Sequence, residues 1–205
     1  MRIKIFILSL IALGAISITA QQPNMNNQKS ENPPYHQIPD TPEDFDNVNV
    51  VARMIDGLGY RYYWATKDLR DEDLAYRPSE DSRTSGETLE HLYGLSKVIA
   101  NGPSSTPNIR PAPEEELTFE EKRRKTLENF EAASNYLKSS KRKHMKNMKI
   151  IFERGEKSSE FPFWNNINGP IEDAVWHAGQ VVVLRRSAGN PINPKVNVFL
   201  GKLNE

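Results

Sequence analysis

The stretch PIEDAVWHAGQVVVLRR, residues 170–186, decides the fold that we predict for this chain. Its pattern predicts a helix whose apolar face is marked at helical spacing by Ala174, Val181 and Leu184. Three polar side chains, Asp173, His177 and Gln180, fall on the same stripe, about one turn apart. We therefore predict that this face points inward. Because unpaired buried polar groups are costly, an imidazole and a carboxylate there need partners, and a bound metal ion is one such partner.

The first 20 residues are typical of a secretory signal peptide. Arg2 and Lys4 precede an apolar run over residues 5–18, and the small residue Ala20 closes the segment. We expect cleavage after Ala20, with an uncleaved N-terminal anchor as the alternative, and no stable membrane span after cleavage. The protein is therefore expected to be exported to the periplasm or the extracellular space.

The absence of cysteine narrows the chemistry. Without a thiol, the chain offers no lipid attachment, no catalytic cysteine and no thiolate zinc site, so a metal would have to bind His, Asp or Glu. The formal charge is 0, and loss of Arg2 and Lys4 with the signal peptide takes it to −2. This balance does not favour nucleic acid as a partner.

The rest of the chain divides into a leader and one domain. Residues 21–42 are rich in Gln, Asn and Pro and are expected to form a disordered leader, whereas residues 43–205 suit a single domain. Amphipathic patterns within it predict four helices, over residues 45–69, 85–101, 118–139 and 170–188. Four such helices favour an all-α four-helix bundle.

Local signals mark the helix ends. Thr41-Pro42 offers a cap and a first-turn proline to the first helix. Capping boxes open the second helix, at Thr84 and Glu87, and the third, at Thr118 and Glu121. The first helix should bury a stripe of apolar residues: Val48, Val51, Ile55, Leu58, Tyr62 and Ala65.

Residues 140–169 interrupt the helical pattern. Two short β-like runs, 148–152 and 160–163, flank Arg154-Gly155-Glu156, which predicts a small hairpin before the last helix. The tail after Gly189 is expected to pack as an extended strap.

The strongest chemical hypothesis is a metal site. His91 on the second predicted helix and His177 on the last one both lie on faces that we assign to the core. Asp173 lies one turn before His177. If these helices are neighbours, the three side chains converge. Two imidazoles and one carboxylate suit a divalent ion such as Zn²⁺ or Ni²⁺. A buried polar network, with His91 hydrogen-bonded to Asp173, is the alternative without a metal.

The pattern GETLEHL at residues 86–92, followed by WHAGQ at residues 176–180, resembles the DinB superfamily. The likeness covers residues 45–189, and the stretch FPFWN at 161–165 resembles an exported, Bacteroidetes-type branch. It implies an up-down-down-up four-helix bundle. Its relatives include YfiT-like metal-dependent hydrolases and thiol-dependent S-transferases.

The resemblance also implies a ligand set. The family commonly binds a divalent metal through one His on the second helix and a His-x-x-x-His pair on the last helix. His91 matches the first position and His177 the last, but the middle position holds Asp173 in place of His. A ligand-capable residue is kept there, and the identity of the metal is left open.

Other polar and aromatic residues have more ordinary explanations. Gln180 is expected to form an interhelical hydrogen bond, with orientation of a metal ligand as the alternative, and Glu87 is expected to cap its helix rather than act as a base. Trp164 and Trp176 are assigned to packing. The basic run over residues 138–149 is expected to be a solvated connector. Core and interface aromatics are expected at Tyr60, Tyr62 and Tyr63, and exposed or leader histidines at His144 and His36.

Three functions remain open on the sequence. The first is a DinB-like, divalent-metal-dependent hydrolase acting on a small molecule of unknown identity, in which a metal-bound water is the nucleophile. The second is an S-transferase that uses a low-molecular-weight thiol. The third is a non-enzymatic binding or stress protein. A homodimer is compatible with all three.

Overall fold

A computed structural model describes residues 32–205, apart from the side chains of residues 142 and 143. The predicted signal peptide and residues 21–31 of the predicted leader lie outside the described residues. The described chain is mostly helical, with two small sheets, so the predicted helical class is confirmed but the protein is not strictly all-α. Within residues 32–205, no helix combines the length and apolar character needed to cross a bilayer.

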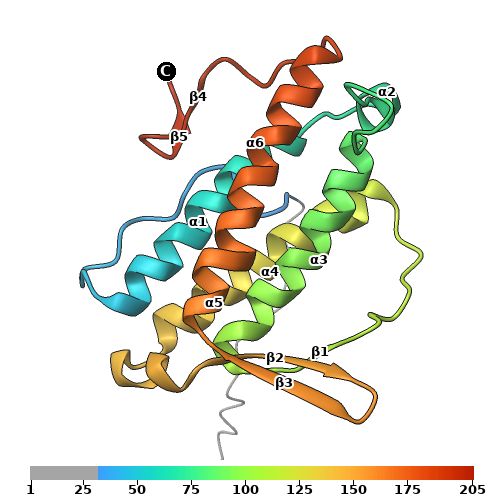
Figure 1. The fold of residues 1–205 in the computed structure, drawn as a ribbon. Helices are drawn as coiled ribbons and strands as arrows, with labels where there is room; N and C mark the ends of the chain where they lie inside the picture. The colour runs from blue at the N-terminus through green and yellow to red at the C-terminus, as the bar shows by residue number, and fades with distance from the viewer. Residues whose placement is uncertain (1–31) are drawn as a thin grey trace, which may run out of the picture. The chain divides into compact units, whose positions relative to one another are not determined.

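Four long helices enclose the core: α1 (Asn47–Thr66), α3 (Ser85–Ser104), α4 (Phe119–Ser139) and α6 (Glu172–Ser187). Each contacts two of the others, because α1 and α3 both pack against α4 and α6. In Figure 1, α1 and α6 run one way and α3 and α4 the other.

Side-chain pairs agree with these directions. Lys122 and Asn129 of α4 reach Glu90 and Ser96 of α3 in the same order along both helices.

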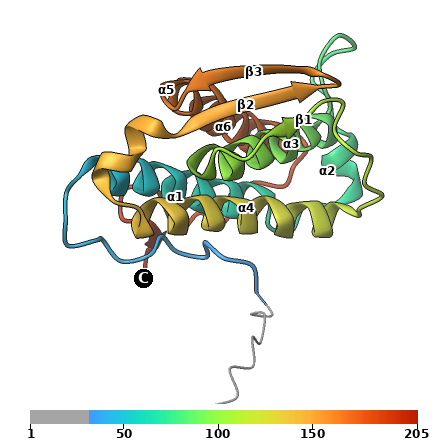
Figure 2. The same ribbon diagram turned by 90° about the horizontal axis from the view of Figure 1, so that it is seen from below.

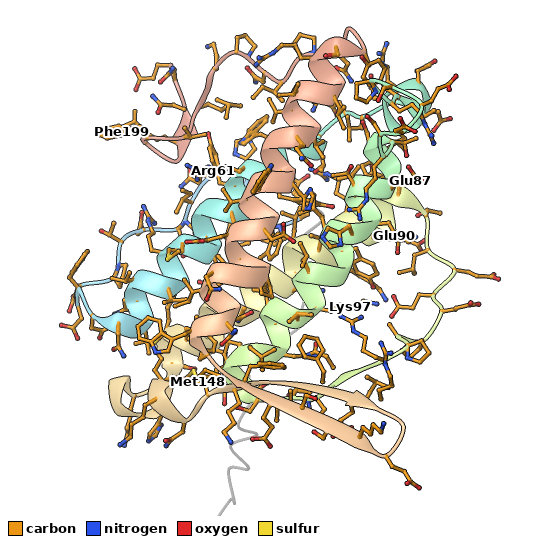
Figure 3. All side chains as sticks on the ribbon, viewed as in Figure 1. Arg61, Glu87, Glu90, Lys97, Met148 and Phe199 are labelled. Carbon is orange, nitrogen blue, oxygen red and sulfur yellow. The ribbon has the colours of Figure 1, made fainter. Side chains whose placement is uncertain are left out.

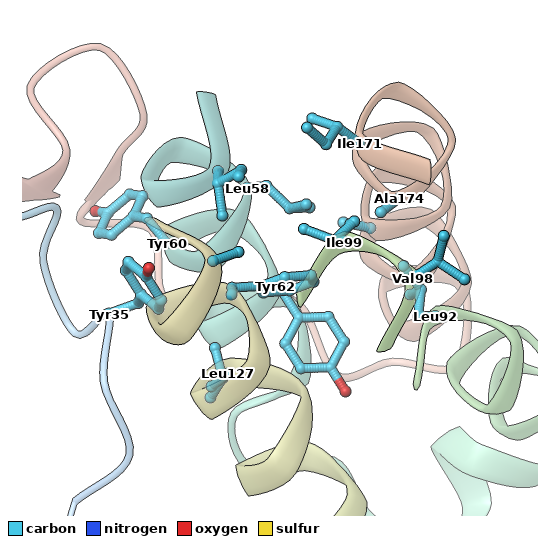
Figure 4. Packing of buried hydrophobic residues seen from close by; sticks show 14 of the residues in the cluster. Tyr35, Leu58, Tyr60, Tyr62, Leu92, Val98, Ile99, Leu127, Ile171 and Ala174 are labelled. Atoms are coloured by element: carbon cyan, nitrogen blue, oxygen red, sulfur yellow. The ribbon is translucent and has the colours of Figure 1, made fainter. Parts of the chain in front are cut away.

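The core fills the space between these helices (Figure 4). Every residue of the apolar stripe that we predicted for the first helix is buried: Val48, Val51, Ile55, Leu58, Tyr62 and Ala65. Tyr60, Tyr62 and Tyr63 are buried as expected, and the ring of Tyr62 meets Phe130 of α4 edge to face. Burial of this apolar surface is the main stabilising contribution to such a fold.

The predicted helix ends are partly correct. Both capping boxes form, with the Thr84 and Thr118 hydroxyls accepting from the third residue of the helix and the glutamates accepting from the capping backbone. The first helix, however, begins at Asn47 rather than near Phe45, because the Asp46 carboxylate, not Thr41, accepts from the backbone of Asn49. The connector after α1 contains a short helix, α2 (Asp71–Ala75).

The predicted hairpin is present. Strands β2 (Lys149–Arg154) and β3 (Lys157–Pro162) pair antiparallel around Gly155, and β1 (Asn108–Ile109) adds a parallel edge. The basic stretch before it forms the short 3₁₀ helix η1 (Arg142–Asn147), and His144 is exposed as expected. The side chain of Ile150 on β2 is buried and belongs to the hydrophobic core.

The approach to α6 begins earlier than predicted. Helix α5 (Trp164–Asn166) leads into the π-helical turn η2 (Ile167–Ile171), and only then does α6 start. Pro170 lies inside this turn, and proline cannot supply a backbone donor to a regular α-helix. The expected start at Gly169-Pro170 therefore falls within a continuous helical segment.

The N-terminal and C-terminal segments differ from the predicted disordered leader and extended strap. Tyr35 is buried and donates a 3.0 Å hydrogen bond to Asp56 of α1. Its ring lies so close to Gly59 that a Cβ atom there would be 2.5 Å away. The tail folds back as β4 (Val196–Asn197) and β5 (Lys202–Leu203), and Gly201 accepts from Ile38, so the two segments lie side by side (Figure 2).

Candidate metal centre

Helix α6 carries two parallel stripes, and only one of them is in the core. The buried stripe consists of Ala174, Ala178, Val181 and Arg185. The stripe with the candidate ligands is displaced from it by one residue and consists of Asp173, His177, Gln180 and Leu184. One residue turns an α-helix by about 100°, so the second stripe flanks the core and faces α3.

We predicted that the candidate ligands lie on the inward face of the helices, but their side chains are only partly buried. The side chains of His91, Asp173 and His177 are 37%, 40% and 15% exposed. They lie at the edge of the core, where α6 packs against α3, and they are accessible from solvent. The displacement by one residue explains the error. We assigned Val181 and Leu184 to one apolar face, but Val181 belongs to the buried stripe and Leu184 to the stripe of the candidate ligands.

The three side chains do converge. The Nε2 atom of His91 is 3.2 Å from one carboxylate oxygen of Asp173, and the Nε2 atom of His177 is 3.3 Å from the other. The two imidazole rings are nearly perpendicular, with centroids 4.8 Å apart. Within residues 32–205 they form the one group of three or more ligand-type residues close enough to hold a metal ion.

Gln180 engages one ring nitrogen of His177. Its Oε1 atom is 2.6 Å from the Nδ1 atom of His177. An amide oxygen can only accept, so Nδ1 of His177 is the donor in this contact, and Nε2 is the ring nitrogen that faces Asp173. Either a proton on Nε2 or a shared cation satisfies the 3.3 Å contact between this nitrogen and the carboxylate. A hydrogen bond from the second ring nitrogen to a fixed oxygen is the usual support of a metal-binding histidine.

The spacing suits a small divalent ion. Bonds of about 2.1 Å would place neighbouring ligand atoms of a tetrahedral site about 3.4 Å apart, close to the two imidazole–carboxylate distances. One ligand atom from each residue can be chosen so that all three lie within 4.8 Å of one another. Three protein ligands leave further coordination positions for water or a ligand. The residues present therefore fit a mononuclear centre.

Open hollows flank the centre. His177 lines a cavity of about 680 Å³ between α6, the start of α3 and the connector before it. His91 lines a second cavity of about 430 Å³ on the outer side of α3. Along α3, Glu87 and Glu90 precede Lys97 on this outer side (Figure 3), and Glu90 pairs with Lys122 of α4.

Several assignments of single residues change. Trp176 and Trp164 are 71% and 75% exposed, so their assignment to packing is wrong, and Trp176 lines the cavity beside His177. Gln180 bonds within its own helix rather than between helices. Glu87 caps α3 as expected, and the hydrogen bond from the backbone of Thr84 holds the pKa of its carboxyl below the usual range.

Sequence reasoning missed Arg83, which lines both cavities. Its place directly before the Thr84 capping residue was the available signal, because the start of the second helix was already predicted there.

Comparisons of the chain with protein-family models, curated proteins and solved structures found no match.

Proposed function

We propose that this protein binds one divalent metal ion through His91, Asp173 and His177. The observation that carries the proposal is the pair of imidazole Nε2 atoms directed at the two oxygens of one carboxylate. The Gln180 hydrogen bond adds support, because it engages Nδ1 of His177 and leaves Nε2 as the nitrogen that faces Asp173. With neutral nitrogens and one carboxylate, Zn²⁺ and Ni²⁺ are the favoured ions.

We further propose that the protein is a DinB-like four-helix bundle. The directions of α1, α3, α4 and α6 support the up-down-down-up order that the sequence resemblance implies. Its metal ligands lie on the second and last long helices, as that resemblance also implies. Export through the N-terminal segment belongs to the same proposal.

Hydrolysis of a small molecule is the reaction that this centre favours. A bound divalent ion would supply an activated water or polarise a substrate carbonyl. Three features of the chain would serve this reaction: the Asp173 carboxylate contacts both imidazole rings, Gln180 engages Nδ1 of His177, and the adjoining cavity can admit a substrate. That cavity counts against a purely structural role, for which a closed site is the usual form.

Metal titration of the untagged protein tests the proposal. Isothermal titration with Zn²⁺ and Ni²⁺, supported by elemental analysis, should give one ion per chain for the wild type. His91→Ala and His177→Ala should each weaken binding by at least about 100-fold. His144→Ala is the matched control, since His144 is an exposed histidine outside the cluster, and it should bind as the wild type does. Stoichiometric metal that persists in the His91→Ala, His177→Ala double variant would exclude this site.

A further inference from the structure

The two cavities beside the candidate metal centre share one charged residue. Arg83 lines the cavity that His177 borders and also the cavity that His91 borders. Arg83 directly precedes Thr84, the N-cap residue of α3. A guanidinium group is therefore available to whatever occupies either side of the centre.

The guanidinium group of Arg83 is not used in a contact that holds the described fold together. Its side chain is exposed, and no described residue forms a hydrogen bond or salt bridge with it. Glu87 is the nearby acid that feels its charge. However, the Glu87 carboxylate already accepts from the Thr84 backbone at 2.7 Å and lies 3.7 Å from the Arg77 guanidinium. The five donors of Arg83 thus remain free to meet an anion.

The rest of the larger cavity is mainly apolar. Its lining includes the exposed ring of Trp176 and the side chains of Val183 and Leu184 from α6, and Pro78 from the connector before α3. An exposed tryptophan in a hollow beside a ligand cluster is the type of surface that binds apolar or aromatic groups. The cavity thus combines an apolar wall, one cationic group and the edge of the candidate metal centre.

From this combination we propose that the natural ligand is a small organic oxyanion with an apolar or aromatic body. Its anionic group, a carboxylate, phosphate or sulfonate, binds Arg83, and its body lies against Trp176 and Val183. The reacting group then lies beside His177. This inference rests on the proposed metal centre for the reaction but not for the anion contact, which Arg83 makes by itself. Arginine suits this role because its planar fork pairs two donors with two oxygens.

A matched pair of probes tests the anion contact without metal. Naphthalene-2-sulfonate carries the charge, and naphthalene-2-sulfonamide is its neutral counterpart of similar shape. Titration of each into EDTA-treated protein, followed by ¹H–¹⁵N NMR, gives the dissociation constant and the residues affected. We expect the sulfonate to bind about tenfold more tightly than the sulfonamide, with shifts at Arg83, Trp176 and Val183.

Three variants complete the design. Arg83→Gln should weaken sulfonate binding about tenfold and leave sulfonamide binding unchanged, whereas Arg83→Lys should restore part of the preference. Arg186→Gln is the control, because Arg186 is an exposed arginine of α6 that lines neither cavity. Equal binding of the two probes to the wild type, or equal loss in Arg83→Gln and Arg186→Gln, would overturn the proposal.

The two proposals fail separately. If metal titration shows no ion but sulfonate binding depends on Arg83, the metal centre is wrong and the anion contact stands. If one ion binds per chain but Arg83→Gln keeps the full preference for the sulfonate, the Arg83 assignment alone is wrong.

Discussion

Gln180 shows how much of the proposed metal centre depends on a side chain outside the candidate ligand set. It supplies no candidate ligand atom, yet its contact with Nδ1 of His177 leaves Nε2 as the ring nitrogen that faces Asp173. The sequence placed it one turn from His177 but gave no means to choose between bonding within the helix and bonding across helices. That choice depends on which face of α6 meets α3.

We predict that Gln180→Ala lowers the affinity for Zn²⁺ by about 10- to 100-fold, the usual effect of losing such a support. Gln180→Glu keeps an acceptor oxygen and should lose less. Because Gln180 is exposed, both variants should unfold at a temperature close to that of the metal-free wild type. Isothermal titration gives the affinities, and an alanine variant that binds Zn²⁺ as tightly as the wild type would rule out the orienting role.

Asp73 is a second residue whose chemistry is set by its neighbours. Its buried carboxylate accepts from the Arg70 guanidinium at 2.9 Å and from Asn190 at 2.6 Å. The hydrogen bonds from Arg70 come first among the causes that lower its pKa well below the usual range. A carboxyl of lowered pKa stabilises the fold above its unfolded pKa of 3.8, and that stability is lost as pH falls below this value toward the folded pKa.

We therefore predict that Asp73→Asn is less stable than the wild type at pH 6 and that the difference narrows steadily below pH 4. Urea unfolding at a series of pH values measures this. Asp71→Asn, which changes an exposed acid of the same short helix, is the control and should stay close to the wild type at pH 6. A constant gap between Asp73→Asn and the wild type over the whole range would contradict the assignment.

At the scale of elements, one arginine joins the end of α6 to the end of α1. The buried guanidinium of Arg185 donates to the carbonyls of Trp64, Ala65 and Lys67 at 2.9–3.1 Å, and also to Asn190. The carbonyls of Trp64 and Ala65 lie in the last turn of α1, and Lys67 is the residue that caps it; no intrahelical donor remains for such carbonyls. Burial lowers the pKa of Arg185, but arginine remains charged at neutral pH.

Replacing Arg185 with Leu should cost about 3 kcal/mol in the free energy of unfolding, because several buried carbonyls lose their donor. Chemical denaturation of the metal-free protein measures the loss. Arg186→Leu removes a neighbouring exposed arginine and should change stability by less than about 0.5 kcal/mol. Similar losses in the two variants would show that Arg185 does not join the helix ends.

The same scale shows what sequence can predict. The capping boxes of α3 and α4 and the turn at Gly155 depend on residues close together in the chain, so their patterns were sufficient. The one-residue displacement of the ligand stripe depends on how α6 packs against α1 and α3. The π-helical turn before α6 and the exposure of Trp176 depend on that same packing. Asp173 and His177 could still be paired from the sequence, because residues four apart lie on the same side of a helix whichever face of α6 packs inward.

For the whole molecule, the N-terminal segment is the least predictable part. Its composition favoured disorder, but Tyr35 is held by Asp56, and the indole of Trp64 donates to the backbone of His36. Gly59 makes this possible, since a side chain at that position would meet the Tyr35 ring. The sequence alone does not indicate this role of Gly59, because its contact partner Tyr35 lies 24 residues earlier in the chain.

We predict that Gly59→Ala releases the segment around Tyr35 without unfolding the helices. Amide hydrogen exchange should then increase for residues 35–38, and the NMR resonances of His91, Asp173 and His177 should stay in place. Gly57→Ala is the control from the same helix, because a Cβ atom there meets only the flexible tip of Arg61, at 3.2 Å. Unchanged exchange in the Gly59 variant would mean that another contact holds the segment.

The partial exposure of the three ligands has a consequence for how the protein would acquire its ion. A closed structural site traps its metal during folding and unfolds when a chelator removes it. Here the core between the helices does not include the candidate ligands, which lie at its edge, so a bound ion would not be needed to hold the helices together. Loading and stripping should be rapid and repeatable on one and the same folded molecule, and occupancy would then follow the supply of metal in the surrounding medium.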